Sequence, residues 1–214
     1  MLYNLHTHKS SGKPHVFEVV NRYPYEELDT PYFSTGIHPW HIDTDKLEEQ
    51  LAVTDERLKL DNCLALGECG LDKRIEIPID MQTEVFEKQL LLAKKHQKPV
   101  ILHCVAAYQE IIEANKRIAP GVPMVIHGFS KNIQIAKQLM DNGFYLSFGK
   151  YLLRNPELSA VFAAVPDDKF FLETDSIEER IEEVYEKAAI ARNISIEQLK
   201  EIVSNNFKTV FGNG

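Results

Sequence analysis

Histidines and carboxylates recur in this chain where short apolar runs end, and these side chains bind zinc and similar divalent ions. A single buried histidine is usually just a hydrogen-bonded core residue. That explanation would have to apply separately at the ends of six apolar runs. Five of the eight histidines in the chain lie at such ends, which is hard to explain by coincidence. The pattern therefore predicts a metal site made by His6, His8, His38, Glu68, His103, His127 and Asp175.

The stretch NLHTH, residues 4–8, holds the first pair. Side chains alternate along a strand, so His6 and His8 would point to the same face and could chelate one ion. An H-x-H pair alone is a weak signal, and the other five residues strengthen it.

The elements that must position these residues alternate between strands and helices. The apolar runs indicate buried parallel strands at 2–6, 16–20, 32–37, 63–68, 99–104, 123–128, 144–149 and 169–174. Amphipathic patterns predict helices at 45–60, 80–97, about 106–117, 130–142, 154–164, 177–192 and 195–212. The last helix has Ser195 as N-cap, Gln198 three residues later and Gly212 at its end.

This alternation predicts an α/β fold, a shortened (β/α)8 TIM-type barrel that forms a single domain over residues 1–214. The connection KSSGKPH is too short for a helical crossover, so the first helix is expected to be missing. The helix over 195–212 is an extra, C-terminal one. Chemistry in such barrels lies at the carboxyl ends of the strands, where we expect the metal site.

Composition limits the function further. The net charge of −8 disfavours broad, non-specific nucleic-acid binding. No signal peptide or membrane span is apparent, and three cysteines without metal-type spacing suit a cytoplasmic protein with reduced thiols. No obligate protein partner is evident. Two divalent ions with Glu68 as their bridge would make a positive pocket that attracts a phosphate.

Six stretches together resemble the TatD family of metal-dependent hydrolases, within the amidohydrolase-like barrels: NLHTH, GIHPW, LGECGLD, VILHC, VIHGFS and FLETD. The C-terminal NFKTVFG is similar to the terminal helix of the family. The resemblance implies hydrolysis of phosphodiesters, often DNA ends or oligonucleotides, with two divalent ions. Zinc is the first choice, and manganese, magnesium, cobalt, iron or nickel are alternatives.

The resemblance also implies a role for each residue. His6, His8, Glu68 and Asp175 would hold one ion, and Glu68, His103 and His127 the other. Asp175 would also accept the proton of the attacking water, and His38 would orient the substrate phosphate or a ligand.

The chain departs from the family at three places. Asn4 replaces the usual Asp, Val105 replaces a common arginine, and the segment after FLETD enters a helix without the usual proline and loop. Three alternatives stay open: an amidohydrolase acting on an amide or lactone, a phosphatase of the polymerase-and-histidinol-phosphatase type, and a metal-binding barrel without catalysis.

Overall fold

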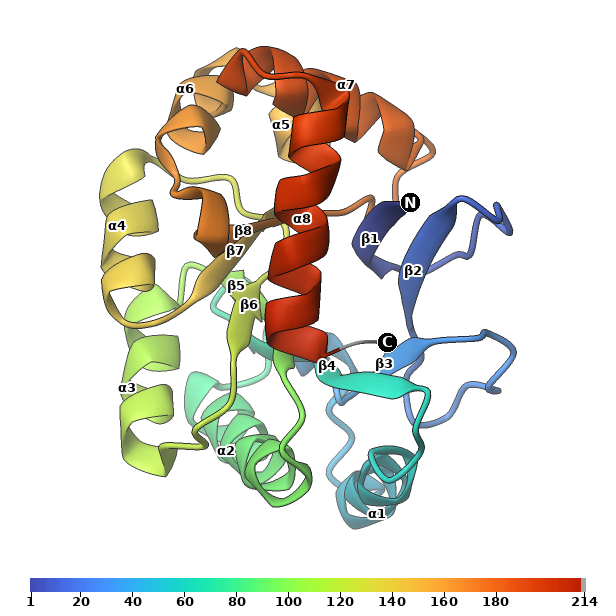
Figure 1. Ribbon diagram of the computed structural model, residues 1–214. Coiled ribbons are helices and arrows are strands. Elements are labelled where there is room, and N and C mark those ends of the chain that lie inside the picture. Colours follow the sequence, from blue (N-terminus) through green and yellow to red (C-terminus); the bar gives the residue numbers. More distant parts are fainter. Residues whose placement is uncertain (213–214) are drawn as a thin grey trace. The chain divides into compact units, whose positions relative to one another are not determined.

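The computed structural model describes residues 1–212, and its strands form one eight-stranded sheet in the order β1 to β8 (Figure 1). The strand pairs β2–β3, β3–β4, β4–β5 and β7–β8 are all parallel. This sequential order, with helices between the later strands, is that of a (β/α)8 barrel, so the predicted fold is confirmed. The strands are β1 Leu2–Thr7, β2 Val16–Asn21, β3 Phe33–Thr35, β4 Cys63–Asp72, β5 Val100–Val105, β6 Met124–Ile126, β7 Tyr145–Phe148 and β8 Phe170–Leu172.

The helices are close to those predicted from sequence. They are α1 Leu47–Arg57, α2 Ile79–His96, α3 Tyr108–Ile118, α4 Ile133–Asp141, α5 Lys150–Arg154, α6 Pro156–Ala164, α7 Ile181–Arg192 and α8 Ile196–Phe211, with short 3-10 turns at Pro39–His41 and Asp167–Lys169. The described part of the chain has no helix long and apolar enough to cross a membrane.

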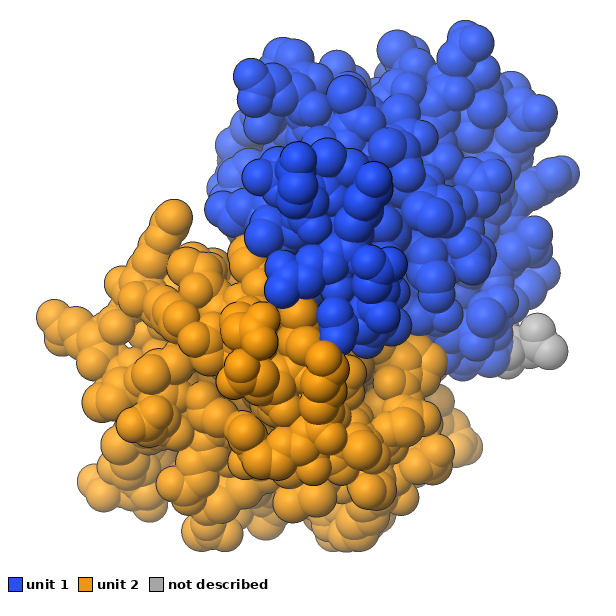
Figure 2. Space-filling view, turned by 90° about the vertical axis from the view of Figure 1, so that its left-hand side faces the viewer, with its two compact units in different colours: residues 1–19, 126–214 blue, residues 20–125 orange. Residues whose placement is uncertain are grey.

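The chain divides into two compact units, coloured separately in Figure 2. Unit 1 comprises residues 1–19 and 126–214, and unit 2 comprises residues 20–125. Each unit is described by itself below, and the single domain over 1–214 stays a prediction.

In unit 2 the core lies along β4, all ten residues of which are buried. One face of α2 packs there through Val85, Phe86, Leu90 and Ala93, which recur at helical spacing. The same face carries the buried Gln89, whose amide accepts from the Ile37 backbone N–H (2.7 Å) and donates to the Ile37 carbonyl (3.1 Å). Gln89 thereby fixes the backbone just before His38.

In unit 1 aromatic rings fill the core between β7, β8 and the helices. Phe162 has edge contacts with Phe148 and Phe170, with ring centroids 4.9 Å apart in each pair. On the other side, the buried hydroxyl of Tyr185 in α7 accepts from the Tyr3 N–H (3.0 Å) and donates to its carbonyl (3.1 Å). Strand β1, which carries His6, is thus fixed against α7.

Strand β1 also meets the segment after β8 within unit 1. Thr7 and Asp175 form a parallel bridge, in which the Asp175 N–H donates to the His6 carbonyl (2.9 Å) and the His8 N–H to the Asp175 carbonyl (3.1 Å). This contact joins the first strand to the chain that follows the last one, as closure of a barrel requires.

The missing first helix and the C-terminal helix are both confirmed. Residues 8–15, between β1 and β2, contain no helix. Residues 22–32, between β2 and β3, contain none either, and the sequence predicted none there. Ser195 and Gln198 form a capping box at the start of α8, and its C-cap is Gly212.

Four boundaries near the candidate site or in unit 1 differ from the prediction. Strand β4 continues to Asp72, so Glu68 lies in its middle and not at its end. Strand β8 ends at Leu172, and Asp175 lies three residues beyond it. The helix expected from 154 is preceded by the short α5, and α7 begins at Ile181 and not near 177.

Candidate metal centre

Each unit holds one group of three residues whose possible ligand atoms all lie within 4.8 Å of one another. In unit 1 these residues are His6, His127 and Asp175, and in unit 2 they are His38, Glu68 and His103. Every member is a histidine or a carboxylate that the sequence singled out.

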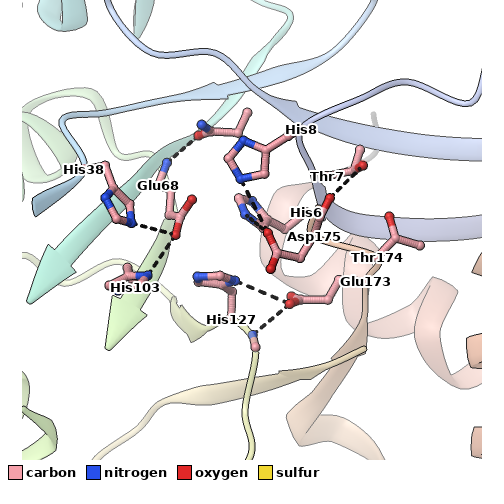
Figure 3. Close-up of polar contacts among 12 residues, drawn as sticks. His6, Thr7, His8, His38, Glu68, His103, His127, Glu173, Thr174 and Asp175 are labelled. Carbon is pink, nitrogen blue, oxygen red and sulfur yellow. Dashed lines mark hydrogen bonds and ion pairs between the residues drawn. The ribbon is translucent and has the colours of Figure 1, made fainter. Parts of the chain in front are cut away.

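The unit 1 group is built on β1, the end of β6 and the segment after β8 (Figure 3). His6 Nε2 lies 3.8 Å from Asp175 Oδ1, and His8 Nε2 lies 3.5 Å from the same oxygen. The rings of His6 and His127 have centroids 4.5 Å apart. His6 is fully buried, whereas the side chains of His8 and Asp175 are about 30% exposed (30% and 27%), so solvent reaches Asp175.

The backbone of Asp175 is in the left-handed region, with φ of 55°. Aspartate tolerates this region better than most residues, but such a conformation persists only where its surroundings fix it. Here the two backbone hydrogen bonds to β1 do so, and the Thr7 hydroxyl donates to the Asp175 carbonyl as well (3.2 Å). The carboxylate is therefore held toward His6 and His8 by strand β1 itself.

Glu173 is a buried carboxylate of this group that the sequence prediction missed. Its Oε1 accepts from the Gly128 N–H (2.7 Å) and lies 3.4 Å from His127 Nδ1 (Figure 3). Its Oε2 is buried and has no hydrogen-bond partner among the described residues. A carboxylate on one ring nitrogen of a histidine leaves the other nitrogen to bind a metal. The available signal was an acidic residue directly after three apolar residues in FFLE.

Asn4, one of the departures from the family, has a clear structural partner. Its side-chain amide donates to the Thr174 hydroxyl (2.9 Å), and its carbonyl accepts from the Thr174 N–H (3.0 Å). A carboxylate in this position could only accept. The amide thus joins β1 to the residue before Asp175 by two hydrogen bonds.

In unit 2 Glu68 lies between two histidines. Its Oε1 is 3.1 Å from His38 Nε2 and 3.0 Å from His103 Nδ1. The Trp40 backbone N–H donates to His38 Nδ1 (3.1 Å), which assigns the proton of a neutral His38 ring to Nε2, facing Glu68. His38 therefore orients the Glu68 carboxylate.

Two glycines of β4 make this arrangement possible. Gly67 and Gly70 have φ of 136° and 141°, and a Cβ on either would collide with a backbone carbonyl of β5, that of Ile101 or His103. Only glycine permits the strands to approach so closely. The close approach brings Glu68 on β4 next to His103 on β5.

Asp72, at the end of β4, is a second carboxylate that the sequence prediction missed. Its Oδ2 accepts from Trp40 Nε1 (2.8 Å) and lies 3.3 Å from His103 Nε2. Burial opposes ionisation of Asp72, but the hydrogen bonds from Trp40, the Arg74 N–H and His103 outweigh it and hold its pKa below the ordinary value. Asp72 is thus an ionised group that fixes both Trp40 and His103.

The donor chemistry of both groups fits a divalent transition metal or zinc. Imidazole and carboxylate are the ligands these ions take, whereas calcium prefers oxygen ligands alone. Each group also has a carboxylate that contacts one of its histidines, Glu173 with His127 in unit 1 and Asp72 with His103 in unit 2. Such carboxylates orient imidazoles that bind metals.

Six of the seven predicted residues belong to these two groups, and the seventh, His8, contacts Asp175 of the unit 1 group. His6, His8, His127 and Asp175 lie together in unit 1, and His38, Glu68 and His103 lie together in unit 2. Their division between two ions, and the bridging role of Glu68, stay predictions.

Comparison with known proteins agrees with this chemistry. A sequence model described as TatD related DNase matches residues 7–212. An uncharacterized metal-dependent hydrolase of Bacillus subtilis, YabD, is 30% identical over 204 residues, which cover 87% of this chain and 79% of that protein. The 3'-5' ssDNA/RNA exonuclease TatD of a Rahnella species is 32% identical over 161 residues, 71% of this chain and 59% of that protein.

Among solved structures, the TatD homologue YJJV of Escherichia coli K12 has the same fold, with a TM-score of 0.83 and 24% identity, over 100% of this chain and 98% of that one. The family match spans nearly the whole chain and includes every predicted site residue except His6, which lies one residue before it. This chain therefore belongs to the TatD-related DNase family of metal-dependent hydrolases.

Proposed function

We propose that this protein is a two-metal phosphodiesterase that acts on single-stranded nucleic-acid ends, oligonucleotides or other small phosphodiesters. The observation that carries the proposal is the pair of histidine–carboxylate groups, one in each unit, in a chain of this family. The name of the Rahnella relative, a single-strand exonuclease, supports nucleic acid as the substrate.

The ligand assignment follows the family resemblance. His6, His8, Glu68 and Asp175 would hold one ion, and Glu68, His103 and His127 would hold the other, with zinc as the preferred metal. Bound ions would supply Lewis acidity, which lowers the pKa of a water and neutralises charge on a phosphate. His38, hydrogen bonded to Glu68, would keep the shared carboxylate in position.

Asp175 would serve as the general base. Its carboxylate is solvent-accessible, and its backbone is fixed by β1, so a water next to Oδ1 or Oδ2 can lose a proton to it. The water oxygen would then bond to phosphorus while the bond from phosphorus to the leaving oxygen breaks. Glu173 would hold His127 and Asp72 would hold His103 through the whole reaction.

Turnover with and without metal tests the proposal. We expect the purified protein to contain divalent metal and to hydrolyse bis(p-nitrophenyl) phosphate and a labelled single-stranded oligonucleotide. A chelator should abolish both activities, and zinc, manganese or magnesium should restore them. Faster turnover of an anilide or a lactone would favour the amidohydrolase alternative, and turnover that resists the chelator would contradict the proposal.

A further inference from the structure

Unit 2 exposes three aromatic side chains close to its candidate metal ligands. These side chains are Tyr25, Trp40 and His41, and we call them the aromatic platform. Tyr25 is 62% exposed and Trp40 58% exposed, among the largest exposures of apolar side chains in the described residues. His41 is also exposed. Isolated exposed aromatics are common on protein surfaces, so exposure alone carries no meaning.

What distinguishes Trp40 is that it is held rigidly beside the candidate site. Its Nε1 donates to the buried carboxylate of Asp72, and its backbone N–H donates to His38 Nδ1. The indole makes an edge contact with the ring of His38 at 5.1 Å and a second with His103 at 5.9 Å. An apolar ring with a fixed orientation, more than half exposed, is thus in direct contact with two residues of the metal-binding group.

The platform extends from Trp40 through His41 to Tyr25. Trp40 and His41 share the turn Pro39–His41, and the ring of Tyr25 lies 6.1 Å from that of His41, nearly perpendicular to it. The ring of Tyr23 stacks on that of Tyr25, with ring centroids 5.7 Å apart. Tyr25 and His41 also line a surface cavity of about 590 Å³.

We infer that the aromatic platform stacks the nucleobases of a single-stranded substrate, with Trp40 receiving the base nearest the scissile phosphate. The inference rests on the proposed function for the identity of the substrate. Base stacking on aromatic rings is independent of sequence, and it requires unpaired bases. The net charge of −8 makes electrostatic attraction of a polyanion weak, so stacking would supply much of the affinity.

Trp40 is the only tryptophan of the chain, so its fluorescence reports on the platform directly. In the Asp175→Asn variant, which slows hydrolysis, we expect a single-stranded hexanucleotide to quench the emission. A hexamer with abasic tetrahydrofuran residues should bind more weakly and leave the emission unchanged. Anisotropy of end-labelled versions of both oligonucleotides measures their binding independently.

Variants separate stacking from damage to the site. Trp40→Ala and Tyr25→Ala should each raise the Kd of the hexanucleotide roughly fivefold to a hundredfold, with little effect on the abasic hexamer. Trp40→Phe, which keeps a ring, should lie between Trp40→Ala and the parent. Leu60→Ala is the matched control, because Leu60 is 41% exposed and lies just before the amino end of β4, where no effect is expected.

Equal affinity of the Asp175→Asn variant for the two hexamers, or bound hexanucleotide without a change in emission, would overturn the inference. Absence of any oligonucleotide binding would overturn it too. Metal-dependent hydrolysis of bis(p-nitrophenyl) phosphate is measured separately and tests the proposed function, so each of the two can fail while the other stands.

Discussion

At the scale of single residues, Asp175 combines a left-handed backbone conformation with a carboxylate that is the candidate general base. Its left-handed φ directs the carboxylate toward two histidines, and its N–H and carbonyl are both bonded to β1. Strand β1 and the residue directly after it thus supply two candidate ligands, His6 and His8, and fix the candidate base. Conformations of this kind cluster at functional sites, because a packed fold can hold a side chain where a relaxed chain would not.

The Asp175→Asn variant tests the role of this carboxylate. Asparagine keeps the size and one oxygen but cannot accept the proton of water at ordinary pH, so kcat should fall about 10²- to 10⁴-fold. Initial rates on the best phosphodiester at saturating metal measure the effect. Metal content and thermal unfolding serve as controls, and a folded, metal-loaded variant within a few-fold of the parent rate would exclude Asp175 as the base.

Glu173 should act through His127 and not on the substrate. Glutamine at position 173 keeps an acceptor for the Gly128 N–H but removes the charge next to His127 Nδ1. Loss of such a partner typically weakens metal binding 10- to 100-fold. We expect a drop of that size in zinc affinity, measured by competition with a chelating dye.

The control for this prediction is Glu183→Gln, which changes a half-exposed carboxylate of α7 paired with Arg180. It should leave the zinc affinity unchanged. An unchanged affinity in Glu173→Gln would instead show that His127 needs no carboxylate partner, or binds no metal.

At the scale of elements, the connection between β1 and β2 contains no helix, and ion pairs hold it against α7. Lys13 Nζ and His15 Nε2 contact the Glu182 carboxylate of α7 at 2.7 and 3.0 Å. Burial opposes ionisation of Glu182, but the hydrogen bonds from Lys13, the backbone and His15 outweigh it and hold its pKa at about 2.

Because this pKa is below that of the unfolded chain, ionised Glu182 stabilises the folded state above about pH 5, and the contribution is lost as the pH falls toward 2. Glu182→Gln should lower the free energy of unfolding by about 1 kcal/mol at pH 7, a modest value because the side chains of Lys13 and His15 are partly exposed to solvent. Urea unfolding of both proteins at pH 7, 5 and 3 measures this difference. The difference should shrink as the pH falls, and a constant difference would contradict the assignment.

The sequence predicted elements well where apolar periodicity was strong. All eight strands were found because each is a short apolar run, and α2 and α8 because their apolar residues repeat at helical spacing. The five-residue α5 was missed because one and a half turns carry no periodicity. The boundary between α5 and α6 is nevertheless encoded in the sequence, because Asn155 caps α6 and Pro156 occupies its first position.

In the candidate site, too, the sequence predicted some residues and missed others. The ends of the predicted strands identified its histidines, Glu68 and Asp175, because a topology rule places chemistry there, although Glu68 lies in the middle of β4 and Asp175 three residues beyond β8. Asp72 and Glu173 were missed because their roles depend on which histidine nitrogen they face, and Trp40 because its exposure and its bond to Asp72 arise only in the folded chain. Pairings between side chains distant in sequence are not encoded in local patterns.

At the scale of the whole molecule, chain connectivity bears on cooperativity. Unit 1 is assembled from both ends of the chain, unit 2 is the segment between them, and the boundary at residues 19 and 20 lies inside β2. Within unit 1, β1 is bonded to α7 and to the segment after β8, so this unit cannot form until residues 126–212 are present. Nothing in the sequence resembles a flexible linker at either boundary. We therefore expect the chain to unfold as one cooperative domain.

Calorimetry with and without metal tests this expectation together with the metal centre. A ligand that binds only the folded state stabilises it by about 2.7 kcal/mol at a hundred times its Kd, which for a chain of this size raises Tm by roughly 5–10 °C. We expect one transition whose calorimetric and van't Hoff enthalpies agree, and whose Tm falls by about this amount for each ion that a chelator removes. Both candidate groups depend on backbone held by the fold, Glu68 by the close approach of β4 and β5 and Asp175 by β1, so metal binding should stabilise the chain as a whole. Two transitions, only one of which responds to zinc, would show that residues 20–125 unfold independently, and would contradict both the single domain and the sharing of Glu68 between ions.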